Sequence, residues 1–252
     1  MIESQQELQI IVADWPAPKV VKAFVTTRQG GASQPPYGSF NLALHVQDER
    51  LHVQQNRRQL EQLLDVQYAP QWLHQVHGSK VIPARSDGVV READACFTGQ
   101  QGLPCAVMTA DCLPVFFCTK QGDQVAVAHA GWRGLASGIL EATLANLAAD
   151  RDELLVWLGP AIGAQKFEVG DEVRAAFMAF SEACAAAFTS RPHKAGYWLA
   201  DLYQLARLRL QMQGVENVYG GDFCTYSDDE RFFSYRRDGV TGRMASLIWI
   251  SP

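Results

Sequence analysis

The sequence predicts an α+β fold, a single domain of mixed β-sheets flanked by helices that spans residues 1–252. Three observations lead to this prediction. Short apolar runs alternate with amphipathic segments, some neighbouring runs are joined by hairpin turns, and no linker, repeat or low-complexity tract divides the chain. A length of 252 residues suits one large domain or two small ones, with ample core in either case.

Composition and charge exclude several classes of partner. Apolar residues make up 48% of the chain and charged residues 19%, as in an ordinary globular protein. A net charge of −5 gives no general attraction to nucleic acid or to acidic membranes. No run approaches the roughly 18 apolar residues of a membrane-spanning helix, and residues 1–15 lack the pattern of a signal peptide. Six scattered cysteines without a CxxC pair favour reduced thiols in a cytoplasmic protein.

The N-terminal third predicts three strands and a helix. Apolar, β-branched runs indicate strands at 8–13 and 20–26, and a further strand at 71–82 is interrupted by Gly78. Residues 48–64 have an acidic start and spaced leucines, which is typical of an amphipathic helix.

A long loop joins the second strand to this helix. Paired glycines and paired prolines forbid regular structure between residues 26 and 46, and long loops in compact domains are often functional. Arg28 stands at its start and Asn41 near its end, so both are candidates for substrate binding. The alternative is a surface excursion with a solvated arginine.

The most informative stretch is 105–134. It predicts a buried strand, a tight loop that holds Cys112, a second strand, a hairpin turn and a third strand that ends at His129. The sequence Gly-Trp-Arg-Gly at 131–134 then begins a helix. A thiol and an imidazole therefore lie at strand ends beside a helix N-terminus.

The remaining chain continues the alternation of helices and strands. The patterns predict helices at 137–149 (with Ser137 as the cap), 172–188 and 199–213, and strands at 154–158, 215–219 and 244–250.

Cys112, His129 and His77 form a competent ligand set for Zn²⁺. One thiolate and two imidazoles leave a fourth position for water or substrate, and such a metal activates bound water. Spacing alone is a weak signal, because a cysteine is more often a small buried hydrophobe and a histidine more often structural. His74 and His77 point to opposite sides of a strand, so they do not form a simple two-histidine motif.

Charged residues near the three ligands suggest an anionic substrate. Arg133 lies at a helix start, where free N–H groups already favour anions. Arg243 belongs to a glycine-flanked group of arginines with the same potential. Asp94 and Glu168 are loop acids that either remain solvated or serve the site.

The motifs resemble the YfiH-like family, also called the laccase-domain or multicopper polyphenol oxidoreductase family. The matching segments are TTRQGGAS (26–33), FNLALHV (40–46), QNRRQL (55–60), QVHG (75–78), ADACFT (93–98), TADCLPV (109–115), AHAGWRG (128–134), GPAIG (159–163), FEVG (167–170) and FFSYRRDGVTGRMASLI (232–248). They cover nearly the whole chain in the family's order.

The resemblance implies a site in which His77, Cys112 and His129 hold zinc, or copper as proposed for some members. It implies small-molecule substrates: phosphorolysis of adenosine, inosine, guanosine and methylthioadenosine, and deamination of adenosine. In this chemistry Arg28 and Arg133 would hold phosphate, and Asp94 or Glu168 would move protons or bind ribose hydroxyls. The oligomeric state stays open.

Three other functions remain open at this point. In a thiol hydrolase that edits a peptidoglycan precursor, Cys112 would be the nucleophile, His129 its base and Asp111 or another polar group the orienting partner. A copper polyphenol oxidase fits the ligand types, but the chain has only six histidines. A non-catalytic metal-binding or partner-binding domain is the third.

Overall fold

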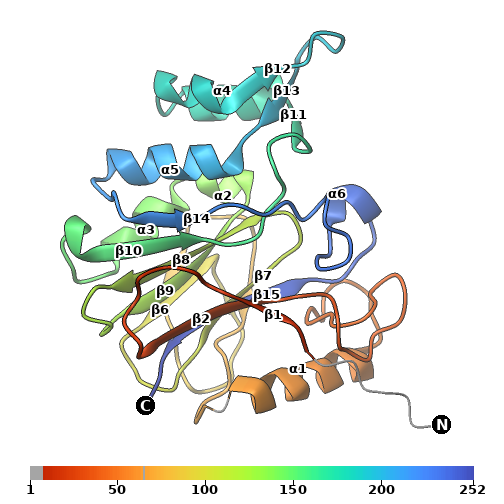
Figure 1. Cartoon of the computed structure of the whole chain (residues 1–252), viewed down its shortest axis with the longest axis vertical. Coiled ribbons are helices and arrows are strands. Elements are labelled where there is room, and N and C mark those ends of the chain that lie inside the picture. The colour runs from red at the N-terminus through yellow and green to blue at the C-terminus, as the bar shows by residue number, and fades with distance from the viewer. Residues whose placement is uncertain (1–7, 65) are drawn as a thin grey trace.

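Two β-sheets packed face to face form the centre of the molecule, and helices cover both outer faces (Figure 1). The computed structural model describes residues 8–64 and 66–252. The first sheet is antiparallel and has the order β1 (Ile10–Val12), β2 (Val21–Thr26), β15 (Met244–Ile250), β7 (Cys105–Thr109). The second sheet is mixed and has the order β14 (Val218–Gly220), β10 (Leu154–Leu158), β8 (Leu113–Thr119), β9 (Val125–Ala130), β6 (Ala95–Thr98), β4 (Val81–Pro83).

Two smaller sheets and the helices complete the architecture. The small sheets are β11-β13-β12, made by Glu168–Gly170, Tyr197–Ala200 and Phe188–Ser190, and the pair β3 (Leu73–His74) and β5 (Arg91–Glu92). The helices are α1 (Arg50–Leu64), α2 (Trp132–Ala136), α3 (Ile139–Ala145), α4 (Asp171–Met178), α5 (Leu202–Met212) and α6 (Tyr235–Asp238), with 3₁₀ turns at Arg151–Glu153 and Glu182–Ala187. This α+β arrangement confirms the predicted fold class.

Strand periodicity sorts the apolar side chains into three layers. In β8, Val115 and Phe117 face the helices α3 and α5, whereas Phe116 faces the other sheet. In β15, Ile248 packs between the sheets and Trp249 points to the outer face that α1 covers. Because neighbouring residues of a strand point to opposite faces, continuous apolar runs are what these doubly covered strands require.

Two of the predicted helices were wrong in their bounds. The segment predicted as one helix at 172–188 is α4 followed by a separate 3₁₀ turn, because the Ser181 hydroxyl accepts a hydrogen bond from the Ala183 N–H and begins a new turn. Ser137 ends α2 and does not cap the next helix. Gly138, with φ of +92°, separates α2 from α3.

Other segments are confirmed in place but shorter than predicted. The strand predicted at 71–82 is two strands, β3 and β4, with the loop at residues 75–80 between them. The predicted strand at 215–219 begins only at Val218. Across the described ranges, no helix combines the length and the apolar character needed to cross a membrane.

Candidate metal centre

Three side chains from separate segments converge at one end of the mixed sheet. His77 lies in the loop after β3, Cys112 immediately precedes β8, and His129 is the second-last residue of β9. Their ligand atoms all lie within 4.8 Å of one another. His77 Nε2 and Cys112 Sγ are 3.9 Å apart, and the two imidazole rings are 4.8 Å apart at an interplanar angle of 75°. The structure therefore brings together the three residues that the sequence proposed as metal ligands.

The β8–β9 register explains the meeting of Cys112 and His129. The strands are antiparallel, with Pro114 opposite His129 and Leu113 opposite Ala130, so the start of one strand adjoins the end of the other. His77 arrives from a different loop with a φ of +60°, a left-handed conformation that is uncommon for a residue other than glycine.

The Asp94 carboxylate forms hydrogen-bond contacts with both histidines. Its Oδ1 lies 2.8 Å from His129 Nδ1 and accepts a hydrogen bond from the His77 backbone N–H at 2.9 Å. Its Oδ2 accepts from the N–H groups of Val76 at 3.2 Å and Gly78 at 2.7 Å. The Asp94 side chain is completely buried and contacts two of the ligand residues, His77 and His129. The sequence analysis expected this carboxylate to move protons or bind ribose hydroxyls.

This contact also sets the state of His129. When the ring is neutral, as metal binding requires, a carboxylate at Nδ1 favours the tautomer that carries its proton there, which leaves the Nε2 lone pair available to a metal. Burial opposes ionisation of Asp94, but the His129 ring and the Gly78 N–H together hold its pKa below the ordinary value.

The site leaves room for a metal and offers a suitable donor set. A β-carbon on Gly131 would lie 2.9 Å from Cys112 Sγ and 3.0 Å from His77 Cδ2, so the absence of a side chain there keeps the ligands accessible. One thiolate with two imidazoles suits zinc and is also acceptable to copper. His77, Cys112 and His129 are therefore suitable ligands for a metal ion.

The thiol and the imidazole stabilise each other's charged forms. Burial raises the pKa of Cys112, but the positive charge of His129 and hydrogen bonds from both histidines outweigh it and lower the pKa to about 6. Burial lowers the pKa of His129, but the Cys112 thiolate and Asp94 outweigh it and raise the pKa to about 9. Cys112 is therefore a thiolate at neutral pH, the form that binds metals and acts as a nucleophile.

A cavity of about 390 Å³ opens beside the three ligands. The other residues that line it are His45, Gln75, Met108, Thr109, Ala110, Tyr235 and Arg243. Arg243 is the only basic candidate among the predicted substrate-binding residues that lies in this lining. His45, Gln75 and Tyr235 were not singled out by the sequence analysis, although each falls inside a family-matching segment.

Arg28 and Asn41 lie outside this lining and fasten the loop that contains them. The Arg28 guanidinium donates to the carbonyl oxygens of Gly38 and Asp229 and lies 5.0 Å from the Phe233 ring centroid. Asn41 is completely buried, and its Oδ1 accepts a hydrogen bond from the Arg243 backbone N–H at 2.9 Å. Asn41 therefore contacts the cavity lining through the backbone of Arg243.

Arg133 and Glu168 are also absent from the cavity. Arg133 is exposed, with its guanidinium 4.4 Å from the Trp132 ring centroid. The Glu168 carboxylate pairs with Lys194 and Arg191 on the small outer sheet.

Asp111 does not orient His129. Its carboxylate accepts hydrogen bonds from the Thr225 hydroxyl and the Arg236 backbone N–H, both at 2.6 Å. Asp111 thus ties the loop before Cys112 to the C-terminal segment. The orienting carboxylate is Asp94.

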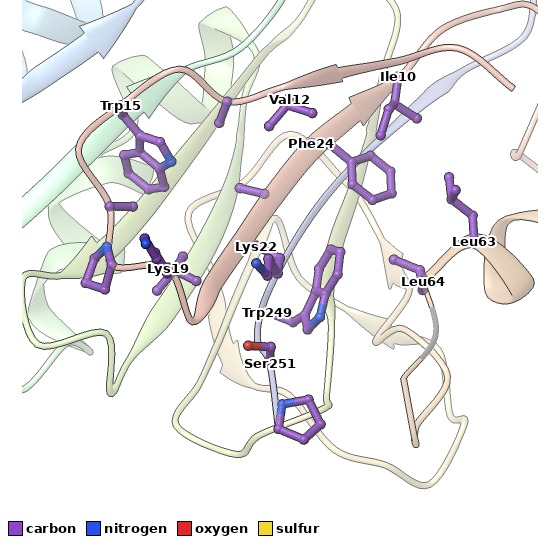
Figure 2. Close-up of a pocket in the computed structure, with 16 residues that line it drawn as sticks. Ile10, Val12, Trp15, Lys19, Lys22, Phe24, Leu63, Leu64, Trp249 and Ser251 are labelled. Carbon is purple, nitrogen blue, oxygen red and sulfur yellow. The ribbon is translucent and has the colours of Figure 1, made fainter.

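A larger hollow of about 690 Å³ lies on the outer face of the antiparallel sheet (Figure 2). Figure 2 shows Phe24 and Trp249 at its centre, with Trp15 at one end and Leu64 at the other. Among the described residues that line it, no side chain is a histidine, a cysteine or a carboxylate. The three candidate ligands line the smaller cavity instead.

Comparisons with known proteins show which family this chain resembles. The family model described as multi-copper polyphenol oxidoreductase laccase matches residues 22–251. A purine nucleoside phosphorylase of Pseudomonas aeruginosa is 53% identical over 240 residues, which cover 95% of this chain and 98% of that protein. The purine nucleoside phosphorylase YfiH of Escherichia coli is 51% identical over 243 residues, covering 96% and 99%.

Solved structures show the same fold. A Neisseria meningitidis protein matches with a TM-score of 0.93 at 48% identity and covers 96% of this chain and 99% of its own. YlmD of Geobacillus stearothermophilus matches with a TM-score of 0.81 at 32% identity, covering 94% of each chain. The matched residues include every metal-ligand candidate, and the chain belongs to the multi-copper polyphenol oxidoreductase laccase family, also known as the YfiH-like family.

Proposed function

We propose that this chain is a zinc-dependent purine nucleoside phosphorylase that also deaminates adenosine. The observation that supports the proposal is the His77–Cys112–His129 cluster, with its ligand atoms within 4.8 Å and Asp94 behind it. Relatives that are 45% to 53% identical over nearly the full length are named purine nucleoside phosphorylases. The expected substrates are adenosine, inosine, guanosine and methylthioadenosine.

Phosphorolysis needs an oriented nucleophile and a stabilised leaving group. A phosphate oxygen forms a bond to C1′ of the ribose, the C1′–N9 bond breaks, and its electron pair leaves with the purine, which takes up a proton. A metal at the triad would supply Lewis-acid polarisation and, for deamination, activation of water.

The residues of the chain keep that site ready for reaction. Asp94 fixes the ring of His129 and the backbone of His77, and Met108 and Ala110 contribute to the lining of the neighbouring cavity. The six cysteines are all unpaired in the structure, which supports the proposal that the enzyme works in the reducing cytoplasm.

Product analysis tests this function. Zinc-loaded protein is incubated with adenosine and phosphate and the products are separated by chromatography. We expect adenine with ribose 1-phosphate, together with inosine, and loss of all three in His77→Ala. His74→Ala is the matched control, because His74 is exposed, lies three residues away and is outside the cluster. Equal turnover by wild type and His77→Ala would contradict the proposal.

A second function is favoured by one observation, the Cys112–His129–Asp94 arrangement. A thiolate, an imidazole and a buried carboxylate in this order also form a nucleophile, a base and an orienting group. The corresponding reaction is amide hydrolysis of a peptidoglycan precursor that carries a wrongly incorporated amino acid. Metal-free protein distinguishes the two, because a thiol hydrolase keeps its activity after chelation and a zinc phosphorylase loses it.

A further inference from the structure

The cavity at the metal centre continues into a second compartment. This outer compartment of about 260 Å³ is lined by His45, Val46, Gln47, Tyr235, Gly239, Val240, Thr241 and Arg243. Three of these residues, His45, Tyr235 and Arg243, also line the inner cavity. They form the boundary between a compartment that contains the three ligands and one that does not.

Arg243 places a positive charge at this boundary. Its NH1 donates to the carbonyl oxygens of Thr241 and Gly242, both at 2.9 Å, and its guanidinium carbon lies 5.8 Å from the Tyr235 ring centroid. Within residues 8–64 and 66–252 it has no carboxylate partner, whereas Arg209 pairs with Glu141. Burial lowers the pKa of Arg243, although the nearby Cys112 opposes that shift. A half-buried guanidinium without a carboxylate is suited to an external anion.

Two further hydrogen-bonding groups stand beside this guanidinium. His45 lines both compartments, and burial together with the charge of Arg243 lowers its pKa. A neutral imidazole still offers one N–H donor. Thr241 is 2% exposed, and its hydroxyl has no hydrogen-bond partner among the described residues. An unpaired buried hydroxyl is costly unless a ligand or water satisfies it.

We propose that Arg243, His45 and Thr241 form the subsite for inorganic phosphate at the boundary of the two compartments. The subsite rests on the proposed phosphorylase function and specifies its second substrate. Phosphate bound there borders the inner cavity, which accommodates the part of the nucleoside that meets the three ligands. Arg28 and Arg133, the arginines that the sequence favoured for phosphate, do not line either compartment.

Steady-state kinetics of the zinc-loaded enzyme test the subsite. For Arg243→Gln we expect the KM for phosphate to rise roughly 10- to 100-fold, the loss of a charged hydrogen-bonded contact, while the KM for the nucleoside changes less than about threefold. Arg243→Lys keeps the charge without the fork and should recover part of the loss. Arg58→Gln is the matched control, since it removes an equal charge from an exposed position on α1. Zinc content and melting temperature confirm that the variants are folded and loaded.

Direct binding separates this proposal from the phosphorylase proposal. Inorganic phosphate is titrated into nucleoside-free holoenzyme by calorimetry. Phosphate binding that Arg243→Gln weakens, in an enzyme with no nucleoside turnover, supports the subsite and refutes phosphorolysis. Phosphorolysis with an unchanged phosphate KM in Arg243→Gln, or a raised phosphate KM in Arg133→Gln instead, overturns the subsite and leaves the phosphorylase intact. Absence of phosphate binding to the wild type also overturns the subsite.

Discussion

Asp94→Asn is the substitution that separates a positioning carboxylate from a chemical one. It keeps the shape of the side chain and removes one acceptor atom together with the charge. In the structure, Oδ2 accepts from two backbone N–H groups, and Oδ1 accepts from the His77 N–H and contacts His129 Nδ1. If the new amide NH₂ takes the place of Oδ2, it faces the N–H groups of Val76 and Gly78. If it takes the place of Oδ1, it faces the His77 N–H and the His129 imidazole.

Both orientations weaken metal binding. With NH₂ toward Val76 and Gly78, the loop that presents His77 loses two partly buried hydrogen bonds. With NH₂ toward His129, the imidazole moves its proton to Nε2 and loses the lone pair that a metal requires. Loss of such a supporting contact typically lowers metal affinity roughly 10- to 100-fold, or about 1.4 to 2.8 kcal/mol.

The fold should also become less stable. An N–H left without an acceptor costs about 1 to 3 kcal/mol when it is buried. The amide leaves two N–H groups unpaired in the first orientation and one in the second, so the protein should lose at least about 1 kcal/mol. For a chain of this size, that loss lowers the melting temperature by at least about 2 °C.

Chelator competition measures the zinc affinity, and thermal unfolding of the metal-free and zinc-loaded proteins measures the stability. Asp87→Asn is the control, because Asp87 forms a solvent-exposed pair with Arg91, and such pairs contribute little to stability. The reasoning is refuted if Asp94→Asn binds zinc within twofold of wild type while its turnover collapses. That result would make Asp94 a group of the reaction itself.

Three further predictions follow from the structure. Gly131→Ala places a methyl group 2.9 Å from Cys112 Sγ and 3.0 Å from His77 Cδ2, so zinc affinity measured by competition should fall roughly tenfold. Gly88→Ala adds a carbon with no atom within 4 Å; its φ of +71° strains the backbone, which lowers stability, but zinc affinity should be unchanged. In metal-free protein, the rate of Cys112 alkylation by iodoacetamide should fall as the pH drops through about 6, because the thiolate is the reactive form. His129→Gln should move the midpoint of this pH dependence upward. A midpoint near 8.5 in the wild type would contradict the charge pairing between Cys112 and His129. Leu60→Ala opens a cavity under α1, in a core cluster that includes none of the three ligands, and urea unfolding should show a loss of about 2 to 5 kcal/mol with zinc affinity retained. Reduced zinc affinity at 25 °C would show that α1 supports the site.

The central strands were predictable because burial on both faces restricts them to apolar residues. The strands β7, β8 and β9 are buried on both faces, so each is an uninterrupted apolar run, and the turn at Gly122-Asp123 marks the hairpin. The α4 region was harder, because its alanine-rich sequence has a high helical propensity throughout. The helix ends there through one local hydrogen bond from Ala183 to Ser181.

The candidate ligands were recognised from motifs, because their spacing contains no geometric information. His77, Cys112 and His129 are far apart in sequence and meet only through the β8–β9 register and the loop around Asp94. The role of Asp94 was missed because three of its partners are backbone N–H groups, which every sequence possesses. Arg28 was proposed as a phosphate ligand because an arginine beside glycines gives no indication that its partners are carbonyl oxygens, and the structure places it outside the cavity lining.

Zinc titration of metal-free protein, with phosphorolysis of inosine followed at each addition, tests whether the His77–Cys112–His129 cluster binds the metal that activity requires. We expect activity that rises linearly and stops at one zinc per chain in wild type and in His74→Ala, with none at any zinc concentration in Cys112→Ser. Full activity in protein that contains no metal would contradict this expectation, as would a saturation point unaffected by the loss of the Cys112 thiol.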